Sequence, residues 1–331
     1  MGCPRVLSGG GLNGAGRILR RLDTLQQRRA TLGFPYAVIR KYADDGGGRE
    51  AALITYYGFL SLFPALLLAQ TVVAWALHRQ PELRRRVVEA MVPPSLQHTV
   101  ESAVIALPTT PAALAVGLTG LVLSGAGVVF AAARTLNHLA AVPYRMRTGD
   151  AWRPVRVVTA LLLLLAGVVA VGCLVVTTTA YAGLPWMSRL LAVAGEGVIA
   201  FVVLVLVARL LLERPASLRA LWPAAAPGAV AVTLTLELGA ALLPGFVRRA
   251  GPVYGAYATV AGMFALLFLL NQALVIAAEA AVVRRARLWP RAVDPSRPTD
   301  ADAHALALLA REQERLPGQR IESRLPPPTG P

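Results

Sequence analysis

The chain has little of the charged surface that a soluble domain needs. Only 15% of its 331 residues are charged, while 56% are hydrophobic, and a soluble domain of this length carries more charge than that. The apolar residues also form long blocks that lack the turn signals expected about every ten residues in a soluble α/β domain. Both absences argue against a soluble protein and favour one that lies in a membrane.

Cysteine and histidine are also scarce. The two cysteines, Cys3 and Cys173, lie in a polar segment and in an apolar block, which argues against a disulfide framework and a cysteine-based metal site. The four histidines lack metal-ligand spacing, and no paired acid and base or carboxylate cluster suggests catalysis. The sequence also shows no ATP-binding motif, so we expect no enzyme, no metal and no cofactor.

Six apolar blocks are long enough to cross a bilayer, which takes about 20 residues. None of them resembles a cleaved signal peptide. We therefore predict an all-α fold, a polytopic membrane protein whose membrane domain covers residues 51–283. The six predicted transmembrane helices are 51–77, 111–133, 157–183, 190–212, 219–246 and 253–283.

The positive charge is divided unevenly between the two sides of this membrane domain. If all six blocks span, 26 of the 33 lysine and arginine residues fall on the side that holds both termini. This is the positive-inside bias, which predicts that the N- and C-termini are cytoplasmic. The net charge of +15 is then explained by topology and by anionic membrane lipids. We expect membrane lipids as partners and no nucleic acid.

Before the first block, the sequence predicts weakly structured and amphipathic segments. Residues 1–16 are rich in glycine and are expected to be disordered. Residues 17–50 alternate basic and apolar groups at helical spacing, which favours cytoplasmic amphipathic helices that either lie on the membrane or are solvated. Within this segment, we expect residues 44–50 to be a flexible break before the first span.

The polar segments between and after the blocks contain further helix signals. Residues 78–110 predict two short helices on the outer side of the bundle, and Pro143 is expected to end a helical extension of the second span. Residues 284–331 predict a cytoplasmic tail that ends in disordered residues. This tail contains a helix candidate at 299–316, for which Thr299 is the expected N-cap.

The first block contains polar groups that an apolar helix must satisfy. Tyr56, Tyr57 and Ser61 precede Pro64, which frees the carbonyl of Leu60 and is expected to bend the helix. In a membrane such side chains need partners inside the bundle. They either line a cavity or, in the case of the tyrosines, form an aromatic belt at the level of the headgroups.

Ionisable and amide side chains inside the later blocks are the other candidates for a substrate path. We expect Glu237 to face a cavity, because no basic residue of its own block is close. Asn271 and Gln272 lie deeper in the sixth block than Glu279. Glu279 either belongs to the path or forms an ion pair that fixes helix ends. Its candidate partners are Arg134, Arg209 and Arg284.

The first block also carries a motif that resembles the start of the YihY/BrkB family of bacterial inner-membrane proteins. The residues that match the family pattern are Ala51, Ala52, Tyr56, Tyr57, Ser61, Leu62 and Pro64. The Pro227-Gly228 pair in the fifth block and Glu279 in the sixth are similar to later family motifs. Alanines replace the glycine and asparagine near this glutamate, so no role of the asparagine is transferred.

The resemblance implies six membrane helices over residues 40–285, a bacterial inner membrane and no known general activity. Some members are linked to lipid or envelope-related transport and to serum resistance, whereas a ribonuclease label has no support in these residues. We expect a transporter or flippase-like carrier of a lipid or envelope amphiphile. The alternative is a non-transporting scaffold that organises envelope proteins, and the sequence leaves the substrate, energy source and oligomeric state open.

Overall fold

The computed structural model of the chain describes residues 30–79, 111–147, 153–180, 187–214, 216–254, 256–294 and 297–323. The expected disordered segment 1–16 and the helices expected within residues 80–110 lie outside these ranges. Over the described ranges the secondary structure consists of eight α-helices and one short 3-10 helix, without a strand. The predicted all-α fold is therefore confirmed.

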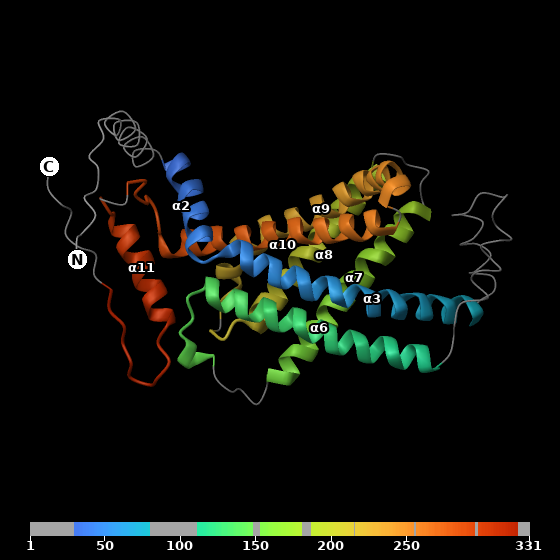
Figure 1. The fold of residues 1–331 in the computed structure, drawn as a ribbon, viewed down its shortest axis with the longest axis horizontal. Coiled ribbons are helices and arrows are strands. Elements are labelled where there is room, and N and C mark those ends of the chain that lie inside the picture. The colour runs from blue at the N-terminus through green and yellow to red at the C-terminus, as the bar shows by residue number, and fades with distance from the viewer. Residues whose placement is uncertain are drawn as a thin grey trace, which may run out of the picture.

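Six of the described helices are long and apolar enough to cross a membrane, as the sequence predicts. Figure 1 shows them side by side in an elongated bundle. α3 packs along α6 and α10, α9 packs along α8 and α10, and α7 packs along α8. The six helices are α3 (Gly47–Arg79), α6 (Pro111–Leu139), α7 (Arg153–Ala180), α8 (Met187–Leu211), α9 (Leu218–Tyr254) and α10 (Ala256–Ala286).

Glycines of α6 let α3 approach closely. A Cβ atom at Gly127 would lie 2.5 Å from the ring of Tyr57, and one at Gly120 would lie 3.1 Å from Pro64. Membrane helices associate through such close packing because lipid provides no hydrophobic driving force between them. α3 continues as a helix through Pro64, so the residue that the sequence singled out is a packing contact of α6.

Several hydroxyl groups inside the spans are satisfied within their own helices. The side chains of Thr55 and Ser124 donate to the carbonyl four residues earlier, at 2.8 and 2.7 Å, and Ser61 donates to the carbonyl of Gly58 at 2.9 Å. Such local bonds replace the water that a bilayer lacks. A hydroxyl in an apolar span therefore does not by itself indicate a cavity in this protein.

Two shorter helices, α2 (Ala30–Asp44) and α11 (Asp300–Glu312), pack at one end of the bundle. Figure 1 shows them where α3 begins and α10 ends, and we call this the α11 end. A small apolar core joins α2, the end of α10 and α11. Its buried members are Ala37, Val38, Val283, Leu288 and Ala305.

The segment 44–50, which the sequence predicted to be a flexible break, is instead almost entirely helical: Asp44 ends α2, Asp45 and Gly46 form a tight turn, and residues 47–50 begin α3. Gly46 adopts a φ of +66°, which a glycine tolerates without strain. The backbone N–H of Asp45 donates to the carbonyl of Lys41 at 2.9 Å, and α3 begins at Gly47. The prediction was wrong because a single glycine in the left-handed region can form a sharp turn between two helices without an irregular segment.

The expected helix of the C-terminal segment is confirmed, with Thr299 as its N-cap. The Thr299 hydroxyl accepts a hydrogen bond from the backbone N–H of Asp302, and the Asp302 carboxylate accepts one from the backbone N–H of Thr299. This reciprocal capping box satisfies two N–H groups at the start of α11. α11 ends at Glu312 rather than at residue 316, and it docks against the bundle.

Candidate functional site

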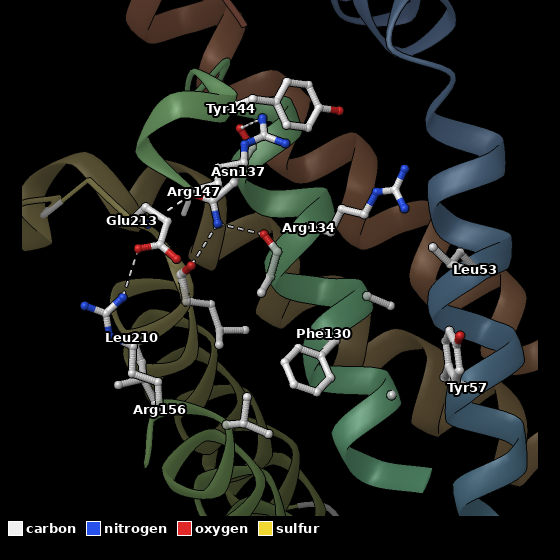
Figure 2. A pocket seen from close by; sticks show the side chains of 15 residues that line it. Leu53, Tyr57, Phe130, Arg134, Asn137, Tyr144, Arg147, Arg156, Leu210 and Glu213 are labelled. Carbon is white, nitrogen blue, oxygen red and sulfur yellow. Dashed lines mark hydrogen bonds and ion pairs between the residues drawn. The ribbon is translucent and has the colours of Figure 1, made fainter. Parts of the chain in front are cut away.

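A groove opens over α6 at the α11 end of the bundle. It has a volume of about 650 Å³ and lies between α3 on one side and the start of α7 and the end of α8 on the other. Figure 2 shows Arg134 and Phe130 on α6, with Tyr57 across the groove on α3. We call this feature the α6 groove.

Apolar side chains form one part of the α6 groove. Leu53 of α3, Phe130 of α6, and Val157 and Leu210 on the far side contribute to this wall. Phe130 is 42% exposed, so its ring is accessible from within the groove. The wall could contact a hydrocarbon chain, because apolar surface of this kind makes favourable dispersion contacts with lipid.

Polar side chains gather where the α6 groove approaches the α11 end. Asn137 organises this part: its amide donates to the carbonyls of Ala133 and Leu211, at 2.8 and 2.9 Å, and its carbonyl accepts from the backbone N–H of Glu213 at 3.0 Å. The bonds to Leu211 and Glu213 satisfy backbone groups at and just after the end of α8 that have no partner within the helix. Asn137 thereby fixes α8 against α6.

Arg147 follows the short 3-10 helix η1 (Tyr144–Met146), whose N-cap is Pro143. α6 already ends at Leu139, so Pro143 is not the residue that ends it, contrary to the prediction. Its guanidinium donates to the carbonyl of Asn137 at 3.0 Å and to the carboxylate of Glu312 at 2.7 Å. The same group lies 4.4 Å from the centre of the Tyr144 ring, within the range of a cation–π contact. Arg147 therefore connects the α6 groove to α11.

Two further arginines lie at the α6 groove, and they differ in their partners. Arg156 of α7 pairs with Glu213 at 3.0 Å, an interaction that Figure 2 marks. Arg134 of α6 is exposed, and it forms no ion pair with any residue that the structure describes. The α6 groove thus carries three arginines and one carboxylate.

A buried ionic cluster lies beside the α6 groove, where α2 meets α10. The Nζ atom of Lys41 lies 2.9 Å from Oε2 of Glu279, pairs with Asp45 and donates to the carbonyl of Leu139 at 3.3 Å. Burial alone would lower the pKa of Lys41, but the carboxylates of Glu279 and Asp45 raise the pKa above its ordinary value of 10.5. Lys41 therefore stays charged.

This cluster corrects the expected partners of Glu279. Its carboxylate is fully buried and pairs with Lys41, whereas the sequence offered three arginines instead. Of the two roles expected for Glu279, the contacts support an ion pair that fixes helix ends rather than a place in a substrate path. The arginines that do not form this pair are Arg134, Arg209 and Arg284.

Glu312 at the end of α11 joins the same network. Its carboxylate lies 2.7 Å from Nδ1 of His138, whose Nε2 lies 3.0 Å from the carbonyl of Asp45. Burial alone would raise the pKa of Glu312, but hydrogen bonds from His138 and Arg147 lower the pKa below its ordinary value. The ionised Glu312 thus holds the end of α6 and the following turn against α11.

The polar residues expected in the first span separate in the structure. Tyr57 lines the α6 groove. Tyr56 is 54% exposed, and its ring packs edge-on against the ring of Tyr57, with 5.3 Å between the ring centres. Ser61 bonds within its own helix and Pro64 contacts α6. Of these four residues, only Tyr57 lines the α6 groove.

The candidates on α9 and α10 also do not line the α6 groove. Asn271 donates to the hydroxyl of Thr55 at 3.0 Å, and the Gln272 side-chain oxygen accepts from the hydroxyl of Tyr42. Both bonds tie α10 to its neighbours.

Glu237 has a basic partner that the sequence did not reveal. Its carboxylate lies 3.0 Å from the guanidinium of Arg189, at the start of α8. The expectation of a cavity role relied on the absence of a basic residue on the same helix, but the partner comes from the neighbouring one.

Three groove residues, Arg147, Arg156 and Glu213, were not identified from the sequence. A signal was available, because the polar loop after the second block is basic, but that charge was assigned to membrane topology alone. Lys41 is the only lysine of the chain, and this could also have identified it as a candidate partner of a buried carboxylate. Over the described ranges, no group of three or more histidine, cysteine or carboxylate side chains could hold a metal ion.

Comparison with known proteins agrees with the motif in α3. The family model described as Virulence factor BrkB matches residues 38–301, a range that begins in α2 and ends in α11. No curated protein and no solved structure matches the chain significantly. The match includes all six membrane-spanning helices, the ionic cluster and the α6 groove. The chain therefore belongs to the BrkB family of membrane proteins.

Proposed function

We propose that the protein is a flippase-like carrier that moves a lipid or envelope amphiphile across the bacterial inner membrane. The α6 groove supports this function, because it joins an apolar wall to an arginine-rich rim in one open space. An amphiphile has the same two parts. The groove is wide enough for a small ligand, since ligand sites in proteins range from about 300 to 1,000 Å³.

The orientation of the carrier follows from charge. In this proposal the α11 end faces the cytoplasm, since most lysine and arginine residues fall on the side that holds both termini. The α6 groove then opens near the cytoplasmic headgroups. We propose no catalytic reaction, because the groove combines charged and apolar groups without a nucleophile and base in contact.

Transbilayer movement of lipid tests this function. The full chain is reconstituted in liposomes that contain fluorescent phospholipids, and the dye that remains protected from an external quencher is followed over time. Ala133→Phe adds bulk inside the α6 groove, whereas Ala115→Phe adds the same bulk to an exposed position of α6 outside it. We expect movement with the wild-type chain and with Ala115→Phe, and its loss with Ala133→Phe.

Folding of each variant is checked by its thermal unfolding midpoint in detergent. If Ala133→Phe does not fold, Val157→Phe fills the groove from α7 instead. Equal movement with a folded, filled groove would reject the α6 groove as the path. If the wild-type chain moves no phospholipid, the lipid-carrier function is rejected, and the non-transporting scaffold becomes the better hypothesis.

A further inference from the structure

The charge of the α6 groove specifies the kind of amphiphile that it fits. Its lining contains Arg134, Arg147 and Arg156 but only one acidic residue, Glu213. Glu213 is already paired with Arg156. Arg147 is likewise paired with Glu312, which lies just outside the lining. The excess positive charge that the groove presents to a ligand is therefore that of Arg134, and a zwitterionic headgroup would leave more of that charge uncompensated than an anionic one.

Of the three groove arginines, Arg134 is the one best able to bind a ligand. It is exposed on α6, and among the described residues it has no carboxylate or carbonyl partner. A guanidinium can form two parallel hydrogen bonds with the oxygens of a phosphate group. Arg134 can therefore bind a headgroup without breaking an existing interaction.

Arg147 is held in place before any ligand arrives. Its bonds to the carbonyls of Asn137 and Val142 and to Glu312 fix its guanidinium beside the Tyr144 ring. A fixed charge loses little conformational entropy when a ligand binds. Arg147 thus presents a fixed guanidinium at the rim rather than a mobile contact, and the Glu312 carboxylate balances its charge.

The position of the arginines along the helices suits a lipid headgroup. Arg134 lies near the α11 end of the apolar stretch Leu114–Leu139, and Arg156 lies at the start of Pro154–Leu174. Phe130, one helical turn before Arg134, lines the same groove. The charged and apolar contacts therefore follow one another along α6, as the headgroup and chain of a lipid do.

We propose that the α6 groove binds the phosphate headgroup of an anionic phospholipid, with Arg134 as its direct ligand. This inference rests on the proposed carrier function, of which it names the substrate class. The apolar wall receives the start of an acyl chain. At the rim, Glu213 keeps Arg156 oriented and Glu312 keeps Arg147 oriented.

Equilibrium binding to the purified full chain tests the inference separately from transport. The chain is held in a neutral detergent and titrated with fluorescent phosphatidylglycerol or phosphatidylcholine. We compare the wild-type chain with Arg134→Gln and Arg209→Gln. Arg209 is a matched control, because it is an exposed arginine near the end of α8 that does not line the groove.

We expect phosphatidylglycerol to bind more tightly than phosphatidylcholine. Arg134→Gln should weaken binding of phosphatidylglycerol by about tenfold or more, the loss expected when a hydrogen bond to a charged group is removed. Arg209→Gln should change it by less than about twofold. Since Arg134 is exposed, its variant should fold, and the thermal unfolding midpoint checks this.

Three results would overturn the inference. They are equal affinity for the two lipids, equal effects of the two arginine variants, and displacement of the lipid by inorganic phosphate at matched concentration. Tighter binding of phosphatidylglycerol that depends on Arg134, without lipid movement, would reject the carrier function and leave the headgroup site intact. Movement of both lipids at equal rates that Arg134→Gln does not alter would support the carrier and reject anionic selection.

Discussion

The Nζ atom of Lys41 lies 2.9 Å from Oε2 of Glu279 and thereby joins α2 to α10. Both side chains are buried, with exposures of 7% and 0%, and Asp45 pairs with the same ammonium group. A lysine suits this position because its compact charge can face two carboxylates at once. The pair closes the bundle at the end where the α6 groove opens.

Removal of Lys41 should destabilise the protein strongly. In Lys41→Met, two carboxylates stay buried without their cation, and breaking a buried pair in this way costs about 3 to 5 kcal/mol. The measurement is the free energy of unfolding in detergent. Arg40→Met is the control, since Arg40 is 40% exposed and its contact with Asp44 is 3.7 Å, so we expect a change below about 1 kcal/mol.

A second substitution separates charge from packing in this cluster. Glu279→Gln in the Lys41→Met background removes one of the two uncompensated carboxylates and should recover part of the lost stability. If the double variant is as unstable as the sum of the two single variants, the residues are not energetically coupled. The assignment of Lys41 and Glu279 as a coupled buried pair that joins α2 to α10 would then be wrong.

Docking of α11 should weaken in acid. Burial alone would raise the pKa of Asp302, but hydrogen bonds from two backbone N–H groups and from Arg291 lower the pKa below its ordinary value of 3.8. The pKa of Glu312 is also lowered, from 4.5. A lowered pKa stabilises the docked state above the ordinary value, and this contribution is lost as the pH falls through the lowered one.

Hydrogen exchange of residues 300–312, corrected for intrinsic rates at each pH, measures this docking. Asp302→Asn should weaken protection at neutral pH by about 1 to 3 kcal/mol and reduce its loss in acid. Asp300→Asn is the control, because Asp300 is exposed at the same turn. An acid transition that is the same in Asp302→Asn and the wild-type chain would show that other groups control docking.

The six spans could be predicted because a bilayer forces every backbone polar group into a helix of minimum length. The N-cap of α11 could also be predicted, since the bonds between Thr299 and Asp302 involve only neighbouring residues. The partner of Glu279 could not. Lys41 and Glu279 meet only after α2 folds back onto α10, and hydropathy contains no information on which helices become neighbours.

The α6 groove illustrates the same limit for the candidate site. Tyr57 was identified because a polar residue in an apolar span is visible in the sequence, and it does line the groove. Arg147 and Arg156 lie in the sequence segment between the second and third predicted spans, whose basic character also follows from membrane topology. The same basic composition fits both a cytoplasmic loop and the rim of a binding groove. Only the spatial arrangement of the side chains could distinguish the two.

Close packing of α3 on α6 should depend on Gly127. A Cβ atom there would lie 2.5 Å from the Tyr57 ring, so Gly127→Ala must displace that ring, at a cost of about 1 to 3 kcal/mol in the free energy of unfolding. Gly172→Ala is the control, because no atom lies within 4 Å of the added Cβ, and it should be neutral or stabilise by up to about 1 kcal/mol. Equal effects of the two variants would reject this contact as a constraint on α3.

Loss of the Glu237 carboxylate should leave both stability and lipid movement almost unchanged. Glu237 and Arg189 are 35% and 75% exposed, and exposed ion pairs contribute about 0 to 1 kcal/mol. Glu237→Gln is therefore compared with the wild-type chain in the unfolding and liposome assays, with Arg189→Gln as the matched partner variant. Since neither residue lines the α6 groove, a folded Glu237→Gln protein that moves no lipid would place the path between α8 and α9. The α6 groove would then be a binding site away from the route of transport.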